Sequence, residues 1–167
     1  MQWRLKQTSG LYDMPTILPD GSLKKDAGGK VITEAKPNAD SGIFLRGLPK
    51  AQINIWCWPC GSGEIWGYRN DTSRSPRRPA CVPKVRADNP VGEWNTFVIA
   101  MKGERVMIVL NGKTVIDNAQ LAGVPTRGPI GLQHHGGFNE KTGQYSPASS
   151  LIQFRNIYIK RLDEGAK

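Results

Sequence analysis

Helical periodicity is almost absent from this chain, and that absence restricts the possible folds more than any other feature. Short apolar runs recur instead, separated by turn residues that include many of the 19 Gly and 12 Pro. Short strands bounded by turn residues are typical of an all-β sandwich or barrel. With 167 residues the chain is long enough to bury a real core, so we predict one all-β domain over residues 1–167.

Turn chemistry predicts two hairpins. Asn111-Gly112 suits a type I′ turn between strands 105–110 and 113–116, because both central residues need positive φ. Residues 9–37 are rich in Pro and Gly, and we predict a long loop insertion there, with a hairpin around Asp20-Gly21.

The strand predicted within residues 50–58 has two unlike faces. Ile53, Ile55 and Cys57 share one face, and the other carries Gln52, Asn54, Trp56 and Trp58. An apolar face opposite a polar, aromatic face is expected of a half-buried sheet with a ligand surface. Three further predicted strands carry polar or aromatic side chains: Arg46 on 41–47, Glu64, Trp66 and Tyr68 on 64–68, and Gln133 and His135 on 129–135.

The net charge of +9 raises the question of a nucleic-acid partner. Basic residues gather between Arg69 and Arg86, but Pro76, Pro79 and Pro83 break that segment and no recognition helix carries the charges. We interpret the segment as a solvated loop and predict no nucleic-acid partner. No apolar run reaches the length of a membrane span, so we predict none.

Three cysteines leave at least one thiol unpaired within the chain. Cys57 and Cys60 have the spacing of a redox motif, but no helical pattern follows them. The alternatives are free thiols, or a bridge between Cys60 and Cys81 beside a buried Cys57.

Five segments together carry a resemblance to a known family. They are Ala39-Asp40-Ser41-Gly42-Ile43-Phe44-Leu45-Arg46-Gly47, Pro90-Val91-Gly92-Glu93-Trp94-Asn95, Val109-Leu110-Asn111-Gly112, Gly128-Pro129-Ile130-Gly131-Leu132-Gln133-His134-His135-Gly136, and Phe154-Arg155-Asn156-Ile157-Tyr158-Ile159-Lys160. Their order and spacing resemble the 3-keto-disaccharide hydrolase domain family over residues 39–162. The resemblance implies a concanavalin A-like jelly-roll β-sandwich of two antiparallel sheets.

The beginning of the chain departs from the family pattern. Family members start with an export signal and one or two earlier strands, whereas this sequence opens on the run Gln2–Lys6. We therefore expect a sandwich that lacks N-terminal strands, and a homodimer that covers the exposed sheet edge. Family members are bacterial and exported, which implies a periplasmic or extracellular location.

The resemblance also implies an activity on carbohydrate. It implies cleavage of glycosides oxidised to a ketone at C3, by elimination and hydration, and the alternative is a non-catalytic carbohydrate-binding module on the same fold. A base near the acidified C–H and a donor near the ketone oxygen are needed, and the candidate catalytic residues are Arg46, Glu64 and His135. Aromatic rings and planar polar groups bind sugars, and the candidate binding residues are Gln52, Asn54, Trp56, Trp58, Trp66, Tyr68 and Gln133.

Acidic residues near this face give one candidate metal site. Asp71, together with Asn70 and Asp88, supplies oxygen ligands of the kind that Ca²⁺ prefers.

Overall fold

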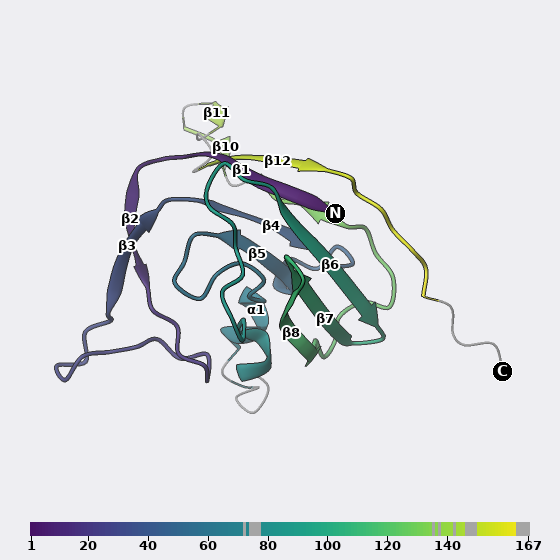
Figure 1. Cartoon of the computed structure of the whole chain (residues 1–167), viewed down its shortest axis with the longest axis horizontal. Helices are drawn as coiled ribbons and strands as arrows, with labels where there is room; N and C mark the ends of the chain where they lie inside the picture. The colour runs from purple at the N-terminus through teal and green to yellow at the C-terminus, as the bar shows by residue number, and fades with distance from the viewer. Residues whose placement is uncertain are drawn as a thin grey trace.

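Two antiparallel sheets face each other across one core (Figure 1). The computed structural model describes residues 1–71, 73, 78–134, 136, 138–141, 143–145 and 150–162. The larger sheet has the order β12-β1-β6-β7-β8, formed by Ser150–Arg155, Gln2–Thr8, Asn95–Lys102, Arg105–Leu110 and Lys113–Gln120. The smaller sheet has the order β5-β4-β9, formed by Gln52–Trp56, Asp40–Phe44 and Gly131–Leu132. This architecture confirms the predicted all-β sandwich.

The core lies between the sheets. Phe97 and Ile108 of the larger sheet and Ile43 and Ile53 of the smaller one belong to one buried cluster, each at most 1% exposed. Full burial of one such side chain contributes about 1.5–3 kcal/mol relative to exposure. Alternation therefore fixes which side of each strand faces inward.

The predicted Asn111-Gly112 turn is confirmed. Asn111 has φ 49° and Gly112 has φ 79°, and Leu110 pairs with Lys113 across the hairpin of β7 and β8. Positive φ at both central positions is what a type I′ turn requires.

The segment predicted as a loop over 9–37 holds two strands. β2 (Leu11–Pro15) and β3 (Thr33–Pro37) pair antiparallel, and together with the residues between them they form an arm, which lies at the left of Figure 1. Their weak apolar pattern explains why the sequence did not reveal them. The hairpin around Asp20-Gly21 is confirmed by a bridge between Ile17 and Leu23.

Short helical elements and a small hairpin complete the described chain. They are η1 (Pro49–Ala51), α1 (Trp66–Arg69), η3 (Pro79–Cys81), β10 (Phe138–Asn139) and β11 (Gln144–Tyr145). None of the helices in the described ranges is long and apolar enough to cross a membrane.

Candidate functional site

The outer face of the smaller sheet carries the polar side chains that the sequence grouped together. In β5, Ile53 and Ile55 point into the core, so Gln52 and Asn54 point to the opposite side. The backbone N–H of Asn54 donates to the backbone carbonyl of Glu64 at 2.9 Å, which places Glu64 beside Asn54 on that side. Two of the predicted site residues thus lie next to each other.

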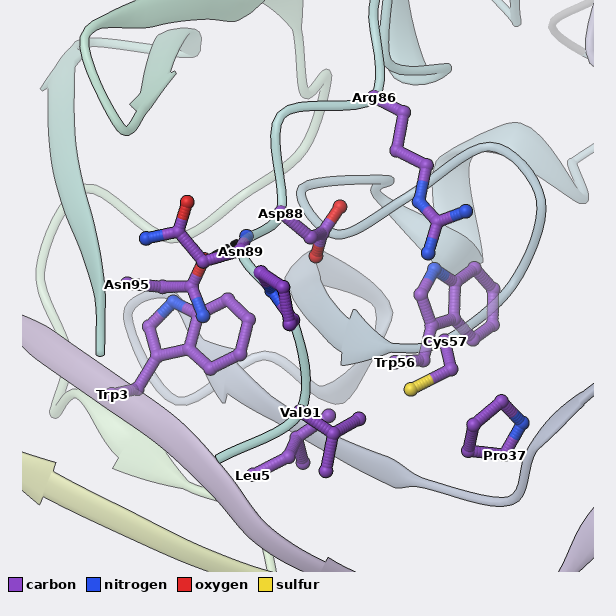
Figure 2. A pocket seen from close by; sticks show the side chains of 11 residues that line it. Trp3, Leu5, Pro37, Trp56, Cys57, Arg86, Asp88, Asn89, Val91 and Asn95 are labelled. Carbon is purple, nitrogen blue, oxygen red and sulfur yellow. Dashed lines mark hydrogen bonds between the residues drawn. The ribbon is translucent and has the colours of Figure 1, made fainter. Parts of the chain in front are cut away.

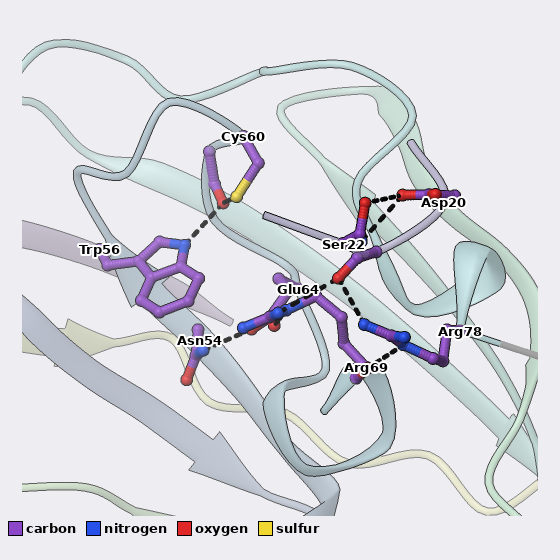
Figure 3. Close-up of polar contacts among 10 residues, drawn as sticks. Asp20, Ser22, Asn54, Trp56, Cys60, Glu64, Arg69 and Arg78 are labelled. Atoms are coloured by element: carbon purple, nitrogen blue, oxygen red, sulfur yellow. Dashed lines mark hydrogen bonds and ion pairs between the residues drawn. The ribbon is translucent and has the colours of Figure 1, made fainter. Parts of the chain in front are cut away.

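Glu64 forms a polar cluster with Asn54 and Arg69 (Figure 3). The Asn54 side-chain amide donates to Glu64 Oε2 at 2.5 Å, and Arg69 Nε donates to Glu64 Oε1 within an ion pair. Glu64 has no exposed surface and Arg69 is 4% exposed. A charge buried this deeply is stable only when it is paired and hydrogen-bonded, as this one is.

Burial raises the pKa of Glu64 to about 7, against an ordinary value of 4.5. Arg69 and the hydrogen bond from Asn54 oppose this shift, and the charge of Asp40 adds to it. A carboxyl group that changes charge near pH 7 can accept or donate a proton under ordinary conditions. Glu64 therefore has the chemistry of a general base or acid.

Arg69 was missed as a site residue because residues 64–68 were predicted to form a strand. That prediction is wrong: Ile65 makes only an isolated bridge with Ile53, and the chain then turns into α1. The helical turn brings Arg69 back toward Glu64. The signal in the sequence was Gly67, where a Cβ would lie 2.5 Å from the Lys50 carbonyl oxygen, a close approach that only glycine permits.

The arm closes over this cluster. The Gly21 carbonyl accepts hydrogen bonds from Arg69 Nη1 at 3.4 Å and from Arg78 Nη2 at 2.9 Å, and Arg78 Nε donates to the Arg69 carbonyl at 2.7 Å (Figure 3). Arg69 and Arg78 were predicted to be part of a solvated basic loop. The structure instead shows them bound to backbone oxygens, so they hold the turn at Gly21 against the site.

Gln52 and Gln133 meet at a second point of the same face. Gln52 Nε2 donates to Gln133 Oε1 at 2.6 Å, and the Gln133 amide nitrogen donates to the Gly42 carbonyl at 2.8 Å. A side-chain amide has two N–H donors and one acceptor oxygen, so each amide of this pair retains hydrogen-bonding groups beyond the one used here. Gln133 is half-buried. The structure thus joins these two predicted binding residues.

Trp56 and Trp58 stack on each other rather than present open rings. Their centroids lie 4.0 Å apart at an angle of 8°. Trp56 is 4% exposed, packs against Ile17 and Val82, and donates its Nε1–H to the Gly61 carbonyl at 2.8 Å. Trp56, which was predicted to lie on a ligand surface, is therefore buried, because Ile17 of the arm packs against it.

Trp66 and Tyr68 lie on opposite sides of α1. Trp66 is 49% exposed, whereas Tyr68 is 4% exposed and belongs to the core, where its hydroxyl donates to the Ala122 carbonyl at 3.1 Å. Tyr68 was predicted to lie on the binding face with Trp66. The helical turn separates the two because their spacing of two residues does not bring them to one helix face.

Arg46 lies apart from Glu64. The chain leaves β4 after Phe44, and Arg46 takes a positive φ of 51°. Its Nη1 donates to the carbonyls of Gly103 at 2.8 Å and Pro125 at 2.9 Å, so it ties two loops together. The predicted strand 41–47 is therefore wrong at Arg46, because the strand ends at Phe44. His135, the third candidate, lies outside the described residues.

Asp71 and Asp88, which were predicted as ligands of a metal ion, bind different residues of the protein. Asp71 pairs with Lys50 and accepts from Ser73, which lowers its pKa to about 2, while both oxygens of Asp88 accept from the Ser62 amide, at 3.1 and 3.2 Å. Within the part of the chain that the structure describes, no three His, Cys, Asp or Glu residues are grouped so that they could hold a metal ion.

All three cysteines are free thiols, which answers the alternatives left by the sequence. Burial raises the pKa of Cys57 to about 11 and those of Cys60 and Cys81 to about 12. Thiols of such high pKa are poor nucleophiles near neutral pH because the thiolate is scarce.

Comparison with known proteins identifies the family. A family model described as "3-keto-alpha-glucoside-1,2-lyase-like domain" matches residues 18–160, which is most of the chain. No curated protein and no solved structure matches the chain. The match covers the smaller sheet, every strand of the larger sheet except β1, and the Glu64 cluster. The chain belongs to the 3-keto-alpha-glucoside-1,2-lyase-like domain family.

Proposed function

We propose that this protein cleaves glycosides that carry a ketone at C3, with Glu64 as the proton-transfer residue. The observation that carries the proposal is the buried carboxyl of Glu64, whose pKa of about 7 suits acid–base work. The family description supports the substrate class.

The proposed reaction is an elimination across C1 and C2 of the sugar. The C3 ketone acidifies the C2–H bond, so Glu64 takes that proton as carboxylate and the electron pair moves toward the ketone as an enolate. The C1–O bond then breaks, the pair forms a C1–C2 double bond, and the departing oxygen takes up a proton to leave as an alcohol. Addition of water across the double bond would complete a net hydrolysis.

The surroundings of Glu64 support a role in binding for its neighbours. The Gln52–Gln133 amide pair offers both donors and acceptors to sugar hydroxyls, and the exposed ring of Trp66 offers an apolar surface to the C–H face of a pyranose. Glu64 itself is fully buried here, so substrate reaches it only when a covering segment moves. The turn at Gly21, bound to Arg69, is the segment that we expect to move.

A second candidate function is carbohydrate binding without catalysis. The specific observation that favours it is that both oxygens of Glu64 are already bonded, to Asn54 and Arg69, as in a structural ion pair. A binding module would use the Gln pair and Trp66 and leave Glu64 unchanged during its function.

The experiment that separates these functions compares two matched glucosides with one chromogenic leaving group. One carries a C3 ketone and the other a C3 hydroxyl. We expect release of the chromophore from the ketone alone. Saturable binding of either compound with no release would contradict catalysis and support the binding module.

Location and assembly belong to this proposal as well. We propose export to the periplasm or cell surface from the family resemblance, and a homodimer through a sheet edge. Cell fractionation and size-exclusion chromatography with light scattering test them separately from the chemistry.

A further inference from the structure

A cavity of about 310 Å³ lies away from the Glu64 cluster, between β1, the end of β5 and the loop 86–91 (Figure 2). Asn54, Glu64 and Arg69 take no part in its lining, and Trp56 is the residue that it shares with the outer face of the smaller sheet. The residues that matter to its chemistry are Trp3, Arg86, Asp88 and Asn89.

Two hydrogen-bond donors of the lining have no protein partner in the described chain. The indole Nε1–H of Trp3 is buried without an acceptor, in a residue that is 1% exposed. The nitrogen itself has almost no exposed surface, so a ligand in the cavity reaches it only when the lining moves slightly. A buried donor without a partner costs about 1–3 kcal/mol, so such groups normally bind water or a ligand. Arg86 is exposed, and its guanidinium makes no hydrogen bond or ion pair with the residues described here.

Acceptors line the same cavity. Among the described residues, the Asp88 carboxylate accepts only from the Ser62 amide, so lone pairs on both oxygens are left over. Asn89 uses its side-chain nitrogen on the Trp94 carbonyl, which leaves its Oδ1 available. Leu5 and Val91 add apolar side chains to the lining.

This combination selects one class of ligand. An anion would be attracted by Arg86 but repelled by Asp88, and a cation would meet the reverse. A hydrocarbon would leave the Trp3 and Arg86 donors unpaired. A neutral ring with many hydroxyls satisfies donors and acceptors together and lays its C–H groups on the apolar wall.

The volume agrees with that class. Because one liquid water occupies about 30 Å³, a cavity of about 310 Å³ holds roughly ten groups of that size. A single pyranose ring with its hydroxyls is of this order. We propose that the cavity is a second carbohydrate-binding site, separate from the Glu64 cluster, which takes one neutral pyranose.

The test uses methyl α-glucopyranoside as the probe and the Trp3 indole N–H resonance as the reporter. The resonance is assigned with Trp3→Phe. We expect a saturable shift in wild type, and affinity about tenfold weaker in Arg86→Ala, the change that corresponds to loss of about 1.4 kcal/mol for one charge-assisted hydrogen bond. Arg127→Ala, at another exposed position, is the matched control and should bind as wild type.

Two further probes test the class of ligand. Glucuronate replaces the neutral sugar by an anion of the same shape, and cyclohexylmethanol replaces it by an apolar ring. Tighter binding of either than of the glucoside, an unshifted Trp3 resonance, or equal affinity in Arg86→Ala would overturn the proposal. The probe lacks a C3 ketone and the Trp3 resonance reports on a cavity that Glu64 does not line, so failure here is distinguishable from failure of the proposed catalysis.

Discussion

The Asn54 side-chain amide donates to Glu64 Oε2 at 2.5 Å, deep in the outer face of the smaller sheet. This bond fixes the orientation of the carboxyl group, and Arg69 holds its other oxygen. The two contacts stabilise the charged form, whereas burial disfavours it more strongly, so Glu64 titrates near pH 7.

Stability should fall with rising pH because of Glu64. Its pKa is raised in the folded state from 4.5 to about 7, so the folded protein binds this proton more tightly than the unfolded chain. That contribution is fully present below pH 4.5 and is lost as pH rises through about 7. Since one pKa unit corresponds to about 1.4 kcal/mol, the loss should be about 3 kcal/mol.

The measurement is denaturant unfolding across this pH window for wild type and Glu64→Gln. The variant, which cannot titrate at this position, should lack that part of the pH dependence. Glu93→Gln, at an exposed carboxyl, serves as control and should follow wild type. Parallel curves for wild type and Glu64→Gln would show that Glu64 keeps an ordinary pKa.

Arg69→Met should move the pH–rate profile. Without the guanidinium, burial acts on Glu64 with less opposition, so its pKa should rise further and the acid limb of kcat should shift to higher pH. The free energy of unfolding should fall by about 3–5 kcal/mol, because a buried charge loses its partner. Arg69→Lys keeps a positive charge, so its acid limb and its free energy of unfolding should lie between those of wild type and Arg69→Met. If Arg69→Met folds and its acid limb stays at the wild-type pH, Arg69 does not control the pKa of Glu64.

Gly21→Ala should displace the turn over the site, because the new methyl group would crowd two arginine side chains in addition to straining the backbone. Gly21 has φ 83°, and an added Cβ would lie 3.3 Å from Arg69 Cγ and from Arg78 Cβ. Gly29 has the same φ with nothing within 4 Å, so Gly29→Ala is a matched control for backbone strain.

We expect each alanine to cost about 1–2 kcal/mol through its positive φ. Gly21→Ala alone should change KM or kcat, because it crowds the two arginines. Activity equal to that of Gly29→Ala would mean that the turn does not control access to Glu64.

Trp66→Ala should weaken substrate binding with little effect on kcat. Trp66 is 49% exposed. Stacking of its ring on a sugar is worth about 0.5–1.5 kcal/mol, or several-fold in KM. Tyr12→Ala removes an exposed ring on the arm, 61% exposed, and should leave KM unchanged. A fall in kcat at constant KM for Trp66→Ala would argue against a binding role.

Period-two alternation correctly predicted the inner and outer sides of β5, because Ile53 and Ile55 leave only one way to orient the strand against the core. The Asn111-Gly112 turn was equally predictable, since its positive φ values demand that pair of residues. Both features depend on local chemistry, which a single sequence contains.

The features that the sequence did not reveal depend on contacts between distant segments. Arg69 reaches Glu64 only because the chain turns into α1, where Gly67 passes close to Lys50. Trp56 is buried because Ile17 packs against it, and Ile17 lies in the arm, some forty residues earlier in the chain. Arg46 does not lie on the predicted strand face, because its guanidinium binds carbonyl groups of the loops at Gly103 and Pro125.

Proton transfer by Glu64 can be followed by NMR of a 3-keto-glucoside in D₂O with wild type and Glu64→Gln, with the C2 proton and the released alcohol measured together. We predict that wild type loses the C2 proton as the alcohol appears, and that Glu64→Gln slows both by at least about 100-fold while it still binds the sugar. Release of the alcohol with the C2 proton retained, or at the wild-type rate in Glu64→Gln, would contradict this prediction.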